Sequence, residues 1–249
     1  YFFYFIRMKM IKLDAIDSTN SYLKKLLNKE SLDDLTVVVS KHQTKGRGRN
    51  KNIWINKPSL NLAFSIYKRF SNFDMDKKFM LNVISSISVY QTLKKYNLYD
   101  LTIKWPNDIM SGNKKISGIL IENNTRGNRI NHTVIGIGIN INQNKFKNLP
   151  NATSVFIETG KLNSVETIAL ELQKILEKNF NRFKLNENEF MDIYNSLLFR
   201  KNEISNFLTP DMSKFQGEII NVNKKGKIKI RQSNQQFFRH SENQIKLII

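Results

Sequence analysis

The stretch LTIKWPNDIMSGNKKISGILIE, residues 101–122, contains two predicted strands with a polar turn between them. Residues 101–105 and 116–122 are rich in apolar and β-branched side chains, which favours strands. Pro106 cannot donate a ladder hydrogen bond, and Asn107 and Asp108 favour a turn directly after it. A third apolar run at residues 133–141 predicts another strand, joined to the second by a hairpin through residues 125–128. These strands predict one sheet.

Helical and strand-like patterns alternate on both sides of this sheet. Toward the N-terminus, Ser18, Thr19 and Asn20 are helix N-cap candidates, and apolar residues then recur at helical spacing to about Asn28. The same half of the chain predicts strands at residues 36–40 and 62–67, a loop at 44–52 and a long amphipathic helix at 79–93. Toward the C-terminus, helices are predicted at residues 165–183 and 189–198.

From about residue 199 the pattern changes to short strands. Residues 216–222, 227–231 and 236–240 are strand-like and are separated by turn signals such as Lys225-Gly226. We therefore predict an α+β fold with two domains. The first covers residues 8–198, and a small barrel-like β domain covers residues 199–249.

The composition excludes several classes of protein. The 249 residues are 40% hydrophobic, which is typical of a globular chain, and contain no Cys and three His. The chain therefore has no disulfides, cysteine-bound zinc, iron–sulfur cluster or thiol nucleophile, and a multi-histidine metal site is disfavoured. No run approaches the roughly 18 to 20 apolar residues of a membrane helix, so we expect no membrane partner and a cytoplasmic location.

The net charge of +19 has two explanations. A functional basic face would bind nucleic acid, whereas a solvated surface would have no such partner. The 40 basic residues include 30 Lys, which are spread along the whole chain. We favour the solvated surface and keep the basic face as the alternative.

Three segments carry charged groups in positions suited to chemistry. In Gly46-Arg47-Gly48-Arg49, flexible backbone flanks two guanidinium groups that suit carboxylate or phosphate, although such loops also occur on ordinary surfaces. Lys104, Asn107 and Asp108 converge at a strand end, where binding sites are common. Lys115 leads into a buried strand and could present a fixed positive charge, whereas we expect Lys114 to lie at the surface.

Gly136 and Gly138 lie inside the apolar strand at residues 133–141. Their sequence, Gly-Ile-Gly, lacks the third glycine and the following helix of a dinucleotide fingerprint, and the chain has no P-loop pattern. The two glycines either leave a shelf for a flat ligand or allow close packing against a helix. The three histidines, His42, His132 and His240, have no triad or metal-ligand spacing, and we expect structural or exposed positions.

Together, these segments resemble the biotin protein ligase family. The matching residues follow the family's order and spacing: Ser18-Thr19-Asn20, Gln43, Gly46-Arg47-Gly48-Arg49 with Trp54, Lys104-Trp105-Pro106-Asn107-Asp108, Lys115-Ile116-Ser117-Gly118, and Gly136-Ile137-Gly138-Ile139-Asn140. The small β module more loosely resembles the family's SH3-like C-terminal domain. The sequence departs from the family in one place, since Arg49 is followed by Asn50-Lys51-Asn52 and not by another Gly-Arg pair. The resemblance implies a mixed-sheet biotin/lipoate ligase catalytic domain followed by an SH3-like barrel.

The resemblance also implies a two-step reaction. Biotin and MgATP give biotinyl-5′-AMP and pyrophosphate, and a lysine of a biotin carboxyl carrier protein, such as that of acetyl-CoA carboxylase, then takes the biotin. The implied catalytic residues are Lys115, Arg47 and Arg49. The implied biotin-binding residues are Ser18, Thr19, Asn20, Gln43, Arg47, Gly48, Arg49, Lys115 and Gly118. The implied ATP-binding residues are Arg49, Trp54, Lys104, Asn107 and Asn140, and Asp108 would orient a lysine or help to hold Mg²⁺.

The N-terminal end bears on the type of ligase. The chain begins without Met while Met8 and Met10 follow closely, so we expect residues 1–7 to be an extension outside the fold. Bifunctional members of the family carry an N-terminal DNA-binding domain, whereas the catalytic pattern here begins at about Asp14. The resemblance therefore implies a monofunctional ligase with no specific DNA partner, and leaves a homodimer open.

Two alternatives to this function remain. A lipoate or octanoate ligase has the same architecture but a different Arg- and Gly-rich signature. A basic nucleic-acid-binding protein would account for the charge and the Arg47–Arg49 loop, but would leave Lys104, Asp108 and Lys115 without a role.

Overall fold

The computed structural model describes residues 9–55 and 57–249, so the expected extension at residues 1–7 lies outside the described chain. Within this part, the larger sheet has seven strands in the order β1-β2-β3-β7-β6-β5-β4. Their bounds are β1 Met10–Ile16, β2 Val37–Gln43, β3 Asn61–Asp74, β4 Leu101–Lys104, β5 Asp108–Ser111, β6 Lys114–Arg126 and β7 Arg129–Asn140. β1 and β2 pair in parallel and the other neighbours are antiparallel, so the sheet is mixed, as expected.

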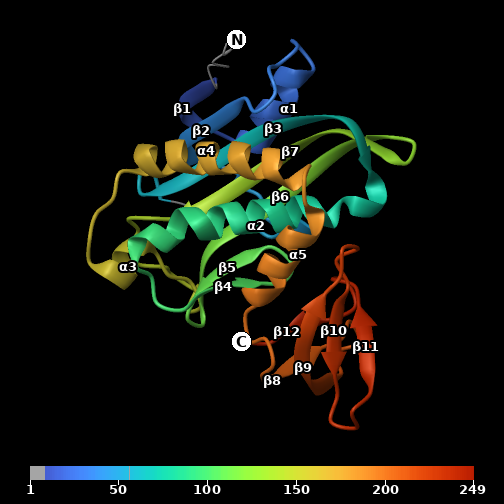
Figure 1. Cartoon of the computed structure of the whole chain (residues 1–249). Helices are drawn as coiled ribbons and strands as arrows, with labels where there is room; N and C mark the ends of the chain where they lie inside the picture. Colours follow the sequence, from blue (N-terminus) through green and yellow to red (C-terminus); the bar gives the residue numbers. More distant parts are fainter. Residues whose placement is uncertain (1–8, 56) are drawn as a thin grey trace.

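Helices cover both faces of this sheet. They are α1 Thr19–Leu27, α2 Phe79–Leu93, α3 Val155–Thr159, α4 Val165–Phe183 and α5 Glu187–Ser196. On β2, Val37 belongs to the main core cluster, whereas its neighbour Val38 packs in a second cluster with Leu23 of α1. Because successive side chains of a strand point to opposite faces, α1 lies on one face and α2 and α4 lie on the other (Figure 1).

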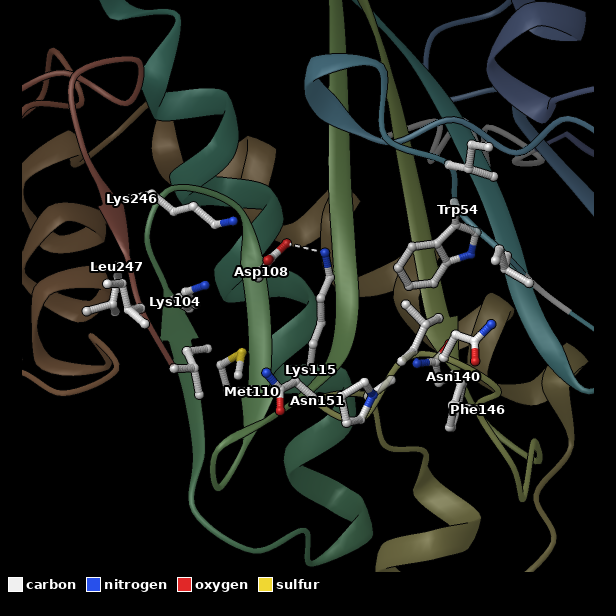
Figure 2. Close-up of a pocket in the computed structure, with 18 of the residues that line it drawn as sticks. Trp54, Lys104, Asp108, Met110, Lys115, Asn140, Phe146, Asn151, Lys246 and Leu247 are labelled. Carbon is white, nitrogen blue, oxygen red and sulfur yellow. Dashed lines mark ion pairs between the residues drawn. The ribbon is translucent and has the colours of Figure 1, made fainter. Parts of the chain in front are cut away.

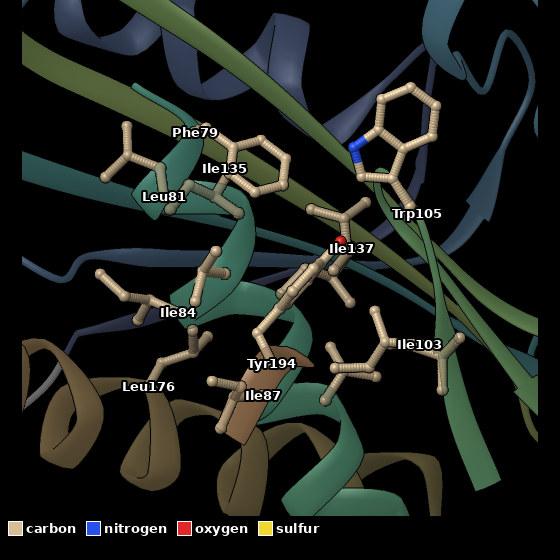
Figure 3. Packing of buried hydrophobic residues seen from close by; sticks show 14 of the residues in the cluster. Phe79, Leu81, Ile84, Ile87, Ile103, Trp105, Ile135, Ile137, Leu176 and Tyr194 are labelled. Carbon is tan, nitrogen blue, oxygen red and sulfur yellow. The ribbon is translucent and has the colours of Figure 1, made fainter. Parts of the chain in front are cut away.

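The central helix α2 is buried nearly all round. Phe79, Ile84 and Ile87 pack with residues of β7, α4 and α5, including Ile135 and Tyr194 (Figure 3). The prediction of an amphipathic helix at 79–93 was right in its bounds and wrong in its polarity, because the serines are buried too.

Two of these serines bond to the preceding turn of α2, whereas the buried Ser86 Oγ has no hydrogen-bond partner among the described residues. Ser85 Oγ donates to Leu81 O at 2.6 Å and Ser88 Oγ donates to Ile84 O at 2.7 Å. A hydroxyl that bonds to the preceding turn has its partner inside its own helix, so Ser85 and Ser88 can be buried under neighbouring helices.

A second, antiparallel sheet follows the helices (Figure 1). Its described strands are β8 Ile204–Leu208, β9 Lys214–Val222, β10 Ile228–Arg231, β11 Phe237–His240 and β12 Lys246–Leu247, in the order β11-β10-β9-β8-β12. The predicted strands at 216–222, 227–231 and 236–240 correspond to β9, β10 and β11. The strand pairs in this part of the chain form an open sheet, with no pair between β11 and β12 that would close a barrel.

The two sheets share one hydrophobic core. Trp105 Nε1 donates to Gly226 O at 3.0 Å, and Asn195 exchanges hydrogen bonds of 3.1 and 2.7 Å with the main chain of Val222. Gly226 has a φ of +79°, and a Cβ there would lie 2.6 Å from the ring of Phe79. The turn between β9 and β10 is therefore fixed against α2 and β4.

Several short elements were not predicted. The four-residue strand β5 begins at Asp108, where a turn was expected, and β12 has two residues. β1 and β8 are further strands absent from the prediction, and β1 is a sheet edge whose residues are exposed or half-buried. Such segments lack the continuous apolar run that marks a buried strand. None of the helices in the described ranges is both long enough and apolar enough to span a bilayer.

Candidate active site

A small polar cavity lies where the start of α1 meets β2, β6 and β7. All nine residues implied for biotin binding line it: Ser18, Thr19, Asn20, Gln43, Arg47, Gly48, Arg49, Lys115 and Gly118. The first three are at most 4% exposed. The helix start is aimed into the cavity, since the backbone N–H and hydroxyl of Thr19 both donate to Gln43 Oε1, at 2.8 and 3.0 Å.

A buried serine completes this polar wall. Ser65 Oγ on β3 lies 2.7 Å from Thr19 Oγ1 and 2.5 Å from Asn20 Oδ1. The sequence analysis did not select Ser65, although a serine inside the apolar run at 62–67 was a possible signal. Its hydroxyl orients two of the cavity residues.

Glu122 on β6 does not line the cavity but contacts two of its residues, Asn20 and Arg47, and was also missed. Its carboxylate accepts hydrogen bonds from Asn20 Nδ2 at 2.9 Å and Lys24 Nζ at 2.6 Å, and pairs with Arg47 Nη2 at 2.8 Å. Burial raises the pKa of Glu122, but the hydrogen bonds from Lys24 and Asn20 and the charge of Arg47 outweigh it and hold the pKa below its ordinary value. Glu122 is therefore ionised and anchors Arg47.

The Gly46–Trp54 loop folds over the cavity as a small hairpin. Trp54 N donates to Gly46 O at 3.0 Å, and Gly48 N donates to Asn52 O at 2.7 Å. Asn50 has a φ of +51°, a left-handed conformation that Asn tolerates better than most residues. The departure from a Gly-Arg pair is thus compatible with an ordered turn. Arg49 Nη1 donates to Asn107 Oδ1 at 3.3 Å.

The glycine shelf on β7 is covered by the protein itself. A Cβ on Gly138 would lie 2.3 Å from the indole of Trp54, and a Cβ on Gly136 would lie 2.4 Å from Asn20 Oδ1. The buried Trp54 Nε1 has no hydrogen-bond partner in the described chain. The cavity beneath has about 50 Å³, room for only one or two waters at roughly 30 Å³ each. Close packing against a helix is confirmed at Gly136, which faces Asn20 of α1, whereas Gly138 faces the Trp54 ring of the protein itself and the shelf for a flat ligand stays a prediction.

A larger cavity of about 630 Å³ adjoins the first (Figure 2). Lys104, Lys115 and Lys246 line it, together with Asp108, whose Oδ1 is 2.6 Å from Lys115 Nζ. Burial lowers the pKa of Lys104, as do the charges of Lys115, Lys246 and Arg200, while Asp108 opposes the shift. With Lys214, four lysines line the cavity against the single side-chain carboxylate of Asp108, which suits a polyanion.

The two cavities meet at Trp54 and Lys115, which line both. Lys115 Nζ lies 5.6 Å from the centroid of the indole. Its main chain is held on both sides, because Lys115 N donates to Asn151 O at 2.7 Å and Thr153 N donates to Lys115 O at 2.9 Å. Lys114 is exposed, as expected. Lys115 therefore presents one charge between two binding spaces.

The structure separates the five residues implied for ATP. Trp54, Lys104 and Asn140 line the larger cavity, whereas Arg49 and Asn107 line the smaller one. Lysines of the second sheet, such as Lys246, also line the larger cavity and were not predicted. No histidine lines either cavity, in line with the expectation for His42, His132 and His240.

The position of Asp108 favours one of its two expected roles. Its carboxylate pairs with Lys115. Among the described residues, no cluster of three His, Cys, Asp or Glu side chains could hold a metal ion. Mg²⁺ commonly takes one or two carboxylates together with substrate phosphates, so the single carboxylate fits only an ion that arrives with a nucleotide.

The mixed sheet, the Gly-Arg loop and the two joined cavities define an α+β catalytic domain of the biotin/lipoate ligase type. The chain belongs to the Biotin/lipoate A/B protein ligase family, whose sequence pattern matches residues 13–140.

Relatives and solved structures are consistent with this family. The bifunctional ligase/repressor BirA of Bacillus spizizenii is 34% identical over 134 residues, 54% of this chain and 41% of that protein. The biotin–[acetyl-CoA-carboxylase] ligase of Paracoccus denitrificans is 30% identical over 131 residues, 52% and 53% of the two chains. The matches thus span about half or less of these relatives.

A solved structure covers more of the chain. The biotin protein ligase from Aquifex aeolicus, in complex with biotin and ATP, has a TM-score of 0.80 and 26% sequence identity. The similarity covers 96% of this chain and 98% of that chain. It therefore includes the second sheet as well as the mixed sheet.

Proposed function

We propose that this protein ligates biotin to a lysine of a biotin carboxyl carrier protein, with ATP as the energy source and biotinyl-5′-AMP as the intermediate. The observation that carries the proposal is the pair of cavities that share Lys115 and Trp54. A closed polar pocket suits the biotin ring, and a larger lysine-lined cavity suits the nucleotide. The Aquifex aeolicus structure, a complex with biotin and ATP, supports this assignment.

The polar wall of the smaller cavity would bind the biotin ring system. A ureido group offers two N–H donors and one carbonyl acceptor, which hydroxyl and amide side chains can match. Ser18, Thr19, Asn20 and Gln43 supply such groups. Thr19 bonds to Gln43, and Ser65 bonds to Thr19 and Asn20, so these side chains are held in place before the ligand arrives. Because the cavity has only about 50 Å³, biotin entry requires Trp54 and the Gly46–Trp54 loop to move.

Lys115 would act on the first step. A carboxylate oxygen of biotin attacks the α-phosphorus of ATP, the P–O bond to the β-phosphate breaks, and pyrophosphate leaves. Two anions must approach each other, so a fixed cation between them lowers the barrier. Lys115 lies at this junction, and Asp108 orients its ammonium group. Arg47 and Arg49 would add positive charge from the loop above.

The larger cavity would hold MgATP. Trp54, Lys104 and Asn140 line it, and Lys104 and Lys246 would neutralise phosphates. Mg²⁺ would enter with the nucleotide and supply charge neutralisation at the phosphates. Arg49 and Asn107 would face the adenylate from the side of the smaller cavity.

The second step transfers biotin to the carrier. The neutral ε-amine of the carrier lysine attacks the acyl carbon, the bond to AMP breaks, and the nitrogen loses a proton as the amide forms. The mixed anhydride must be shielded from water until the carrier docks, and the Gly46–Trp54 loop would provide that cover. We place the reaction in the cytoplasm, as expected for an ATP-dependent enzyme of this kind.

We divide the chain into a catalytic domain at residues 8–198 and a C-terminal domain at residues 199–249. The main chain at the junction is hydrogen-bonded to β4. Ile103 N donates to Leu197 O at 2.7 Å, and Phe199 N donates to Ile103 O at 2.9 Å. These hydrogen bonds at the junction support a fixed placement of the second sheet beside the larger cavity.

One experiment tests the function. The protein is incubated with ATP, Mg²⁺ and a purified carrier domain, with biotin in one arm and octanoate or lipoate in the other. Biotin on the carrier, with pyrophosphate released in equal amount, is the expected result. Transfer of octanoate or lipoate in place of biotin would reassign the substrate, and no transfer of either acid would contradict the proposal.

A further inference from the structure

The two arginines of the Gly46–Trp54 loop are held by two different sheets. Arg47 pairs with Glu122 on β6 of the mixed sheet, whereas Arg49 pairs with Glu242 of the second sheet. Neither partner belongs to the family motifs in the sequence. The Arg49–Glu242 pair joins the loop over the smaller cavity to the C-terminal part of the chain.

Glu242 is held in a defined turn between β11 and β12. Gln244 N donates to Ser241 O at 2.9 Å, and Ser241 N donates to the Gln244 side chain at 2.7 Å. Ile245, at the end of the turn, is 5% exposed and belongs to the shared core. The carboxylate of Glu242 is therefore presented from a fixed backbone.

The Arg49 side chain is confined between two groups. Its Nη1 donates to Asn107 Oδ1, and its Nη2 pairs with Glu242. Asn107 is fixed in turn, because its Nδ2 donates to Ile119 O at 2.6 Å. The Arg49 side chain is 23% exposed, so solvent screens this pair less than a fully exposed one.

We propose that Glu242 is a positioning residue that holds Arg49, and with it the closed Gly46–Trp54 loop, against the second sheet. Arg49 has five N–H donors, so it can keep Glu242 on one edge while another edge faces a phosphate or carboxylate. The pair then stabilises the closed loop with and without ligand. It slows both the entry of biotin and the escape of biotinyl-AMP. This inference rests on the proposed function.

A closed state stabilised equally in the free and bound protein has a kinetic signature. Removing the pair should speed association and dissociation by the same factor and leave the equilibrium affinity unchanged. For a partly exposed ion pair, the expected factor is about 2- to 5-fold. If Glu242 instead competed with the ligand for Arg49, its removal would tighten binding.

The test uses Glu242→Gln in the full chain. The ligands are biotin and a non-hydrolysable sulfamoyl analogue of biotinyl-AMP. Stopped-flow fluorescence reports on Trp54, one of two tryptophans in the chain. We expect faster biotin association and faster analogue dissociation by about 2- to 5-fold, with both dissociation constants unchanged.

Two further variants make the test specific. Glu218→Gln removes a carboxylate that pairs with Arg231 in the same sheet and lines neither cavity, so the rates should not change. In an Arg49→Gln background, Glu242→Gln should have no further effect, since its partner is gone.

Several outcomes would overturn the inference. These are unchanged rates, an effect that persists in the Arg49→Gln background, or tighter analogue binding without faster dissociation. If the wild-type protein binds neither ligand, the proposed function fails as well. Binding with unaltered rates overturns only the role of Glu242.

Discussion

The two cavities of this protein are built in different ways. The smaller one lies between the mixed sheet and α1, and hydrogen bonds to Gln43 and Ser65 fix Thr19 in its wall. The larger one lies across both sheets and is lined by lysines from each, including Lys104 and Lys246. A preorganised polar pocket selects one ligand shape, whereas an open cationic cavity attracts charge. Under the proposed function, the first cavity would select the acid and the second would bind the phosphates.

Lys115 should give the largest effect, because it belongs to both cavities. Lys115→Ala is expected to slow adenylate formation by about 10²- to 10³-fold, by analogy with the loss of one charge-stabilising donor. Pyrophosphate release measures this step. Lys114→Ala is the matched control, since Lys114 is exposed beside it, and should be nearly silent. Equal losses in both variants would remove Lys115 from the chemistry.

Substitution of Arg49 should affect the retention of the intermediate more than its formation. Arg49→Gly is expected to form biotinyl-AMP but to release it faster, because hydrogen bonds between charged groups contribute about 1.5–3 kcal/mol. Trapping with hydroxylamine measures the released adenylate, and an unrelated protein in the mixture should become biotinylated. A variant that makes no adenylate, or releases it no faster than wild type, would contradict the retention role.

Gly138 tests whether Trp54 forms the partition between the cavities. A Cβ at this position would lie 2.3 Å from the indole, so Gly138→Ala should lower the free energy of unfolding by about 1–3 kcal/mol through overpacking. In a Trp54→Leu background the loss should be smaller, because the ring is absent. Urea unfolding measures both. The same loss in both backgrounds would show that other contacts limit the site.

Lys104 should give the smallest effect of the four positions, and this effect should be visible only when the pH is varied. Its pKa is lowered, chiefly by burial, so it loses its proton at a lower pH than an ordinary lysine. As pH rises toward the ordinary value of about 10.4, ATP affinity should fall a few-fold. Stability should instead rise in this window, because the unfolded chain binds more protons than the folded one.

Calorimetry of ATP binding measures the expected fall in affinity with pH, and urea unfolding measures the expected rise in stability. Lys104→Arg keeps its charge at every pH used and should remove both. An alkaline loss of affinity that persists in Lys104→Arg would assign the titration to another group.

The sequence predicted the smaller cavity better than the larger one, for a physical reason. Arg47 and Lys115 lie in segments whose local composition is unusual, and the family resemblance added Thr19. Glu122 ends a predicted strand and carries no local signal of a site, and only the three-dimensional arrangement brings Asn20, Lys24 and Arg47 to its carboxylate.

Local sequence also fails to predict the contribution of the second sheet to the site. Glu242 and Lys246 contribute to the site through contacts between sheets, which no local pattern encodes. The long strands and helices were predicted because their hydrophobic periods are regular. The missed β1, β5 and β12 are edge or very short strands. The polarity of α2 was misjudged because Ser85 and Ser88 bond to their own helix and can be buried.

The main-chain clamp on Lys115 has a consequence for mutational tolerance. Asn151 contributes its carbonyl group and Thr153 its amide N–H. Any amino acid offers such a carbonyl, and any but proline offers such an N–H. Side chains in the adjoining wall, such as Phe146 and Leu149, can therefore be exchanged to reshape the larger cavity while Lys115 stays in register. A library of substitutions in this wall, with Thr153 kept free of proline, offers a route to altered nucleotide preference.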